Sequence, residues 1–170
     1  MAASSMPFLV DRLGEDSVHK LEAAASRRFA EAESLRERGF TVGAVYLYGY
    51  VAETRLKAAY FGGVMRFAAD KDITRKDREQ ATDEAYNLSL MSKAPHDILG
   101  WARFLVFKQK QQKAGYSRQL EAELKAYALD LYSCWRPALR YRVTVIYPSE
   151  LRTVRASANW FEAHYHELRR

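Results

Sequence analysis

Arginine and aromatic side chains are concentrated in one segment of the last third of the chain. Five arginines fall between positions 136 and 155, with Glu150 as the single acidic residue among them: Arg136, Arg140, Arg142, Arg152 and Arg155. The aromatic residues beside or between them are Tyr132, Trp135, Tyr141 and Tyr147. Guanidinium groups bind phosphate through paired hydrogen bonds, and aromatic rings stack on bases. The segment therefore suits an RNA or nucleotide site. Alternatively, these arginines attach the segment to the fold through carboxylates and carbonyl oxygens.

A second candidate is a carboxylate in an apolar segment. Glu53 follows a run of small and apolar residues, and a buried carboxylate needs a partner. Lys57 lies one helical turn later, in the orientation that favours an ion pair. We expect either this intrahelical pair or a contact across the fold, in which Glu53 orients Arg136 or Arg140 and supports an anion site.

The histidines give weaker signals. His96 and Asp97 stand where a helix begins, so Asp97 is expected to cap that helix and His96 to bond locally. His164 and His166 flank Tyr165 and point to different sides of the last helix. We therefore predict no metal site. The chain has no glycine-rich phosphate loop, nucleophile elbow or paired-carboxylate motif, so no cofactor is expected.

The composition is that of a globular helical protein. Of 170 residues, 48% are hydrophobic and 28% charged, and only eight Gly and four Pro interrupt the chain. The single cysteine, Cys134, excludes an internal disulfide, and no apolar run is long enough to span a membrane. We expect a cytoplasmic protein. The net charge of +6 is compatible with an anionic partner but also with a role in solubility alone.

Apolar periodicity predicts the elements that must position these residues. We expect a helix from Asp16 or Ser17 to Gly39, a largely buried helix from Thr41 to about Phe67, and a solvated loop or short helix over 70–83. A further helix is expected from near Pro95, another from Ser117 to Pro137, and an extended segment over 140–147. The last helix should be capped by Ser149 and bury Val154, Ala158, Phe161, Tyr165 and Leu168.

These elements predict an all-α fold, an up-and-down bundle of about five helices. Residues 1–16 are expected to form an N-terminal arm, and residues 17–170 a single domain.

Three short segments resemble the HEPN family. Gly43–Glu53 (GAVYLYGYVAE) with Leu56–Ala58 is similar to the second helix of that family, and His96–Ile98 to the start of its third. Trp135–Arg142 (WRPALRYR) looks like the end of the fourth helix in a bacterial branch. The resemblance covers roughly residues 17–168 and implies a helical bundle that usually dimerises and often handles RNA or nucleotides.

The motif of the family's metal-independent ribonucleases, an Arg followed after four to six residues by a His, is absent where the resemblance would place it. Arg155 and His164 are separated by eight residues, which puts them on opposite faces of a helix. Arg12 and His19 satisfy the spacing, but they lie in the N-terminal arm, and we treat that match as chance.

We therefore expect a HEPN-like homodimer that binds RNA or a nucleotide, as a variant or degenerate ribonuclease or toxin–antitoxin component. If it cleaves RNA, Arg140 or Arg142 would stabilise the phosphate and His96 would be the general acid or base. The alternative is a non-catalytic helical module that dimerises and partners another protein, such as a toxin, an antitoxin or a nucleotidyltransferase-like protein.

Overall fold

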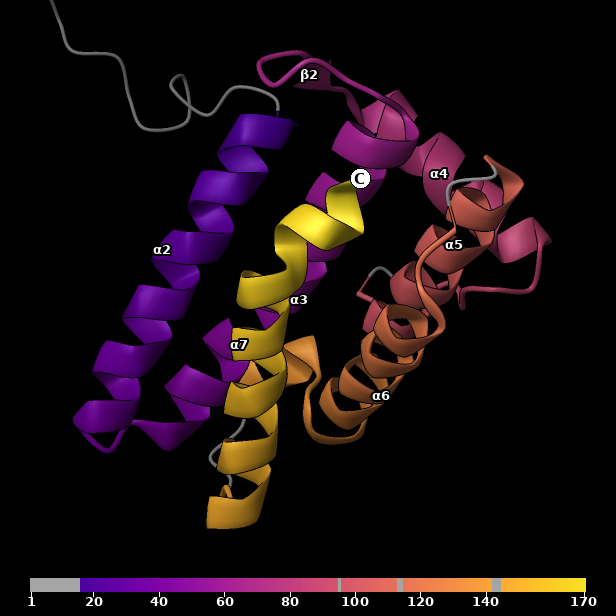
Figure 1. The fold of residues 1–170 in the computed structure, drawn as a ribbon. Helices are drawn as coiled ribbons and strands as arrows, with labels where there is room; N and C mark the ends of the chain where they lie inside the picture. Colours follow the sequence, from indigo (N-terminus) through magenta and orange to yellow (C-terminus); the bar gives the residue numbers. More distant parts are fainter. Residues whose placement is uncertain (1–15, 95, 113–114, 142–144) are drawn as a thin grey trace, which may run out of the picture.

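The computed structural model describes residues 16–94, 96–112, 115–141 and 145–170. Within these ranges the chain is mostly helical, as expected (Figure 1). The six α-helices in them are α2 (Val18–Glu37), α3 (Thr41–Ala59), α4 (Arg75–Asn87), α5 (Ile98–Gln111), α6 (Arg118–Cys134) and α7 (Pro148–Arg169). A π-helical turn, η1 (Tyr60–Val64), extends α3, and a 3-10 turn, η2 (Pro137–Tyr141), follows α6.

Helix α3 is the centre of the bundle. It contacts α2, α5 and α7, while α6 packs against α5 and α7 (Figure 1). Its side chains are buried on most sides, including Tyr48, Val51 and Leu56, as the apolar sequence of its first half predicts. Gly63 allows η1 to approach the end of α7 closely, because a Cβ at this position would lie 2.3 Å from the carbonyl oxygen of Arg169.

Helices α3 and α7 lie side by side and run in the same direction. Tyr48 of α3 and Arg155 of α7 both donate hydrogen bonds to the carboxylate of Glu33. Seven residues further along α3, Arg55 donates to Glu162 of α7. Because both series of residue numbers rise together, α3 and α7 are parallel neighbours, with α4, α5 and α6 between them in the chain. Helix α2 runs antiparallel to both.

The expected helix boundaries agree closely with the structure at several ends. Ser17 caps α2 and Ser117 caps α6, each accepting a hydrogen bond from a backbone N–H of the first turn. Helix α7 buries its predicted seam of Val154, Ala158, Phe161, Tyr165 and Leu168. It begins at Pro148, however, and Ser149 is not its cap; the Glu150 carboxylate instead accepts from the backbone N–H of Tyr147.

Two segments correct the sequence prediction. The region expected as a loop or short helix contains α4, which is capped by Thr74 and Asp77 and buries Ala81 and Ala85. The described residues therefore form six α-helices instead of about five. Arg140 and Tyr141, expected to be extended, belong to the 3-10 turn η2. A lone strand would leave its backbone groups without partners, whereas here the Leu139 N–H donates to the Arg136 carbonyl.

The only strands in the described part of the chain are two short ones that join the start of α2 to the connection after η1. Strand β1 (Asp16–Ser17) pairs antiparallel with β2 (Asp72–Ile73). Asp16, placed in the arm by the sequence prediction, therefore belongs to the folded domain. Residues 1–15 of the predicted arm, with Arg12, lie outside the described residues.

No helix among the described residues has both the length and the apolar character to cross a lipid bilayer.

Candidate functional site

The buried carboxylate of Glu53 on α3 forms the base of the site. Its side chain is 3% exposed and accepts hydrogen bonds from Lys57 Nζ at 2.5 Å and from His96 Nδ1 at 2.9 and 3.0 Å. Burial alone would raise the pKa of Glu53, but the bond to His96 and the charge of Lys57 outweigh it and hold the pKa below its ordinary value. Glu53 is therefore an anion in the neutral pH range.

This carboxylate fixes the proton arrangement of His96. An ionised carboxylate can only accept hydrogen bonds, so Nδ1 of His96 must carry the proton that it donates to Glu53. In the neutral ring, Nε2 is then the basic nitrogen. A histidine held in this tautomer by a carboxylate can take a proton from a bound hydroxyl group.

The start of α5 holds His96 in place. Asp97 is the N-cap, as predicted, and its carboxylate accepts from the backbone N–H of Gly100 at 2.8 Å and from both the N–H and the hydroxyl of Ser92 at 2.8 Å. These bonds join the 92–97 connection to the helix. The local bond that we expected for His96 is replaced by the contact with Glu53, 43 positions earlier.

The end of α6 is anchored on the same face of α3. Trp135 is 2% exposed, its indole N–H donates to the Tyr46 carbonyl at 2.9 Å, and its ring covers Gly49 so closely that a Cβ there would lie 2.1 Å away. The ring also meets Tyr50, with centroids 5.4 Å apart. Trp135 is therefore a packing residue, and at 2% exposure its ring offers no open face for stacking on a base in this structure.

Arg136 and Arg140 are brought beside His96 by this anchor. Arg136 donates to the carbonyls of Tyr132 and Trp135, and its guanidinium carbon lies 4.0 Å from the Tyr132 ring centroid. Arg140 is exposed and lies over the Tyr141 ring at 4.5 Å, and its hydrogen bond with the Tyr46 side chain raises the pKa of the guanidinium above its already high value.

These side chains surround one cavity of about 430 Å³. Its lining includes His96, Tyr132, Arg136, Arg140 and Tyr141. The size is within the range of small-molecule sites, about 300–1,000 Å³. Asp97 also lines it, but the carboxylate is occupied by the three donors of the cap. Arginines, exposed tyrosines and a histidine with a free basic nitrogen together suit a ligand that carries phosphate and a base.

The remaining predicted residues separate into different places. Of the two alternatives predicted for Glu53, the structure shows the intrahelical pair with Lys57 and no bond to Arg136 or Arg140. Arg155 bonds to Glu33 on α2 at 2.8 Å, and Tyr48 donates to the same carboxylate. Because Tyr46 and Tyr48 point about 200° apart around α3, Arg155 lies on the opposite side of that helix from Arg140. Arg152 is exposed on α7, and Arg142 lies outside the described residues.

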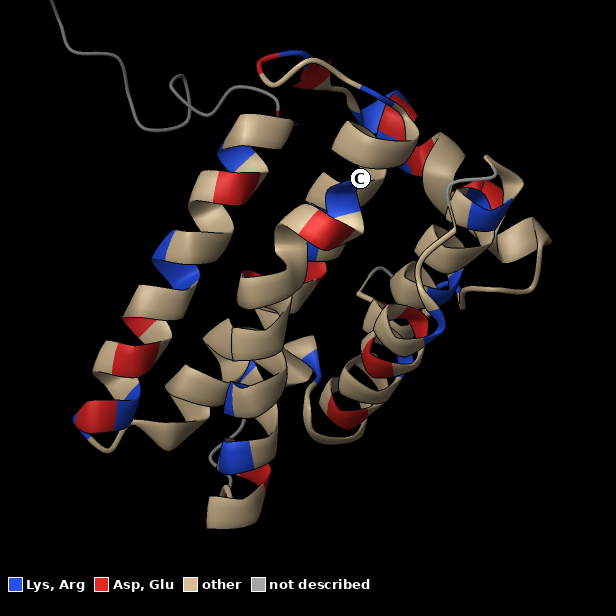
Figure 2. Ribbon diagram, viewed as in Figure 1, with Lys and Arg blue, Asp and Glu red and all other residues tan. Residues whose placement is uncertain are grey.

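The basic residues do not form one continuous surface. Figure 2 shows Lys and Arg intermixed with Asp and Glu along α2, along α7 and over the α5–α6 pair. The basic residues of the described fold are therefore dispersed, and the case for an anion site rests on the cavity beside His96. Among the residues described, no group of three or more His, Cys, Asp or Glu side chains is placed to hold a metal ion.

Sequence reasoning missed two side chains of the site. Tyr46 and Tyr50 on α3 connect Arg140 to His96: the two hydroxyls lie 3.4 Å apart, and the Tyr50 and His96 rings are 5.8 Å apart. Burial raises the pKa of Tyr50, so it stays protonated. Their spacing of four positions places them on one helix face. Because α3 is apolar on most sides, the sequence does not show which of its faces lies at the site.

Comparisons with known proteins add no further identification: no family model, no curated protein and no solved structure matches the chain.

Proposed function

We propose that the chain binds single-stranded RNA or a nucleotide in the cavity formed by His96, Tyr132, Arg136, Arg140 and Tyr141. The observation that carries this proposal is the position of two arginines and two exposed tyrosines around one hollow of suitable size. The guanidinium groups supply phosphate contacts, and the tyrosine rings supply stacking surfaces.

The three HEPN-like segments support a proposed relationship to that family. Glu53 comes from the first segment, His96 from the second, and Arg136 and Arg140 from the third, and all of them gather at or beneath the one cavity. If these three distant segments build one site, that shared site would explain why all three resemble the same family. Dimerisation and a place in a toxin–antitoxin pair belong to the same proposal.

Binding of a short fluorescent single-stranded RNA at two salt concentrations tests the proposed function. We expect salt-sensitive binding, because phosphate contacts release counterions, and a loss of at least tenfold in Arg140→Ala. Arg118→Ala is the matched control, since Arg118 is an exposed arginine at the other end of α6. Absent binding, or equal loss in both variants, would overturn the proposal and favour the alternative of a protein-interaction module.

The Glu53–His96 pair favours RNA cleavage as a second proposed activity. Nε2 of His96 would take the proton of a ribose 2′-hydroxyl, whose oxygen attacks the adjacent phosphorus. The 5′-oxygen of the next nucleotide leaves and takes a proton from water, and a 2′,3′-cyclic phosphate remains. Arg140 would stabilise the charge that develops on the phosphate oxygens. Glu53 is a positioning residue in this scheme because it acts through His96.

Incubation of the protein with RNA, with and without EDTA, tests cleavage. We expect metal-independent formation of cyclic phosphate ends, abolished in His96→Gln while RNA binding persists. In Glu53→Gln the rate should fall and its pH profile should change, again with binding retained. A His96→Gln variant that cleaves at the original rate would exclude this mechanism.

A further inference from the structure

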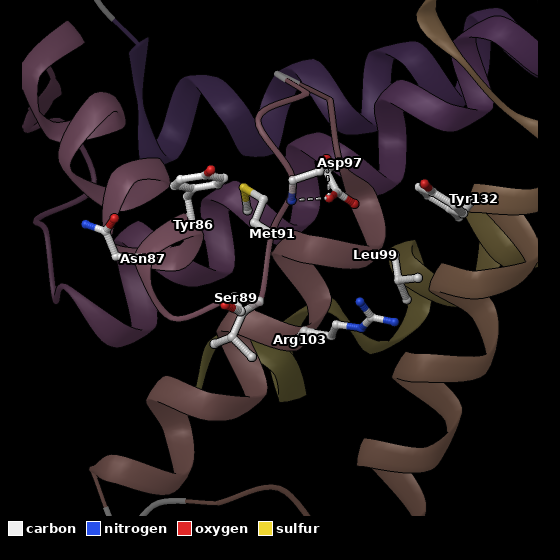
Figure 3. A pocket seen from close by; sticks show the side chains of 10 residues that line it. Tyr86, Asn87, Ser89, Met91, Asp97, Leu99, Arg103 and Tyr132 are labelled. Carbon is white, nitrogen blue, oxygen red and sulfur yellow. Dashed lines mark hydrogen bonds between the residues drawn. The ribbon is translucent and has the colours of Figure 1, made fainter.

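A second hollow adjoins the proposed nucleotide site. It has a volume of about 700 Å³ and shares Ser92, Asp97 and Tyr132 with the cavity beside His96. Figure 3 shows Tyr86 and Asn87 from α4 on one side of it and Tyr132 from α6 on the other, with Met91 between them. The two hollows therefore meet at Tyr132.

Arg103 gives the second hollow an available positive charge. This side chain is exposed on α5 and extends toward α6 at the opening (Figure 3). Within the described part of the chain, no residue forms a hydrogen bond or ion pair with Arg103. The neighbouring lysines differ in this respect, because Lys57 is bonded to Glu53 and Lys108 to Glu84.

The cations of the other neighbouring hollow are already engaged. This hollow shares Ser92 and Ala94 with the cavity beside His96 and is also lined by Lys57, Arg75, Arg78, Lys93, Glu79 and Asp83. Lys57 is bonded to Glu53, Arg75 to Glu79 and Arg78 to Asp16, and Lys93 lies over the Tyr86 ring. In the hollow that contains Arg103, the lining carboxylate is that of Asp97, whose oxygens are already engaged by Ser92 and Gly100. The Arg103 side therefore offers a guanidinium that no described residue holds, which favours it as the continuation of a phosphate path.

We infer that the Arg103 hollow is a second nucleotide subsite, so that the ligand is a single-stranded oligonucleotide of two or more nucleotides. This inference rests on the proposed function of the first cavity. Tyr132 lies at the boundary, lines both hollows and is 38% exposed, with the Arg136 guanidinium over its ring. The second phosphate is held by the Arg103 guanidinium.

Titration of the full chain with AMP and with the 5′-phosphorylated dinucleotide of adenosine tests this inference. The dinucleotide should bind about tenfold more tightly than AMP, and its plot of log K against log salt should be steeper by about 0.7 for the additional phosphate contact. Arg103→Gln should remove both differences and leave AMP affinity within twofold. Arg118→Gln is the matched charge control, about 21 Å along α6 from Tyr132, and its melting curve and that of Arg103→Gln should match the parent protein.

The possible results separate the two proposals. A dinucleotide that binds no more tightly than AMP, or a gain that survives Arg103→Gln, overturns the second subsite and leaves the first. Arg140→Gln should weaken both ligands. If neither AMP nor the dinucleotide binds, the proposed function and this inference fail together.

Discussion

At the scale of single residues, Glu53 connects the folding of the chain to its candidate chemistry. Its carboxylate is buried, while its partners Lys57 and His96 have side chains that are 24% and 32% exposed. Lys57 and His96 can therefore bond to water if Glu53 is removed, whereas the buried carboxylate of Glu53 has only these two side chains, among those described, to compensate its loss of hydration. The same interaction that makes this buried charge tolerable also sets the tautomer of His96.

We expect Glu53→Ala to destabilise the fold by about 1.5–3 kcal/mol, the typical net contribution of hydrogen bonds to a charged group. Glu79→Ala is the control, because Glu79 forms an exposed pair with Arg75 on α4. Its effect should stay within about 0.5 kcal/mol. Urea unfolding of the two variants measures both; equal effects would show that the burial of Glu53 contributes nothing to stability.

Glu33 predicts a pH dependence of stability. The hydrogen bond from Arg155, with further bonds from Tyr48 and Arg36, lowers the pKa of Glu33 from 4.5 to about 2. A carboxyl whose pKa is lower in the folded state stabilises the fold above its unfolded value and loses that contribution as the pH falls toward the folded value. The free energy of unfolding should therefore decrease as the pH falls from about 4.5 to about 2.

Unfolding of Glu33→Gln across this range measures the contribution. The difference in stability from the parent protein should be largest above pH 4.5 and should shrink toward pH 2. Glu37→Gln is the matched control, since the side chain of Glu37 is 68% exposed and should show little pH-dependent difference. A difference for Glu33→Gln that is constant with pH would refute the assignment.

Residues close in sequence were predictable, and residues that meet across the fold were not. The Glu53–Lys57 pair and the Asp97 cap follow from spacing alone. The bond between Glu53 and His96 spans 43 positions, and no local pattern encodes it. The arginines show the same limit: Arg140 and Arg155 are near in sequence but lie on opposite sides of α3.

At the scale of elements, periodicity identified the helices but not how they pack. The buried seam of α7 was confirmed because its spacing of three and four residues admits one helix face. The 3-10 turn η2 was missed, because its position depends on Trp135 packing over Gly49 and not on its own pattern. The parallel contact of α3 with α7 was also missed, because α4 was not counted as a helix of the bundle: alternating directions make these two helices antiparallel in a series of five and parallel in the series of six.

Two glycines of α3 give a test of the Trp135 anchor. A Cβ at Gly49 would meet the Trp135 ring at 2.1 Å, whereas one at Gly43 would meet the end of the flexible Leu35 side chain at 3.1 Å. Gly49→Ala should therefore cost about 1–3 kcal/mol of stability and weaken RNA binding, because η2 would be displaced. Gly43→Ala should be neutral or stabilising by up to about 1 kcal/mol, since alanine favours helix. Thermal unfolding and RNA titration of both variants compare them; similar effects would argue against a specific anchor.

At the scale of the whole molecule, α3 joins every part of the candidate site. It supplies Glu53, carries the tyrosines that meet Arg140, and seats Trp135, while α5 and α6 bring their ends to the same place. The expected all-α class is confirmed, and one core cluster includes buried residues of α2, α3, α4, α5, α6 and α7. A site assembled from three distant segments exists only when this packing is complete.

This arrangement predicts that the chain unfolds as one cooperative unit. The three tryptophans report on different parts of the core: Trp101 in α5, Trp135 at the end of α6 and Trp160 in α7, which are 1%, 2% and 5% exposed. Because each packs into the cluster centred on α3, their fluorescence should change at the same urea concentration as the helical circular dichroism. Separate transitions would show that α5 and α6 unfold independently of α2, α3 and α7. In that case His96 and the arginines would be held together less firmly than the candidate site requires.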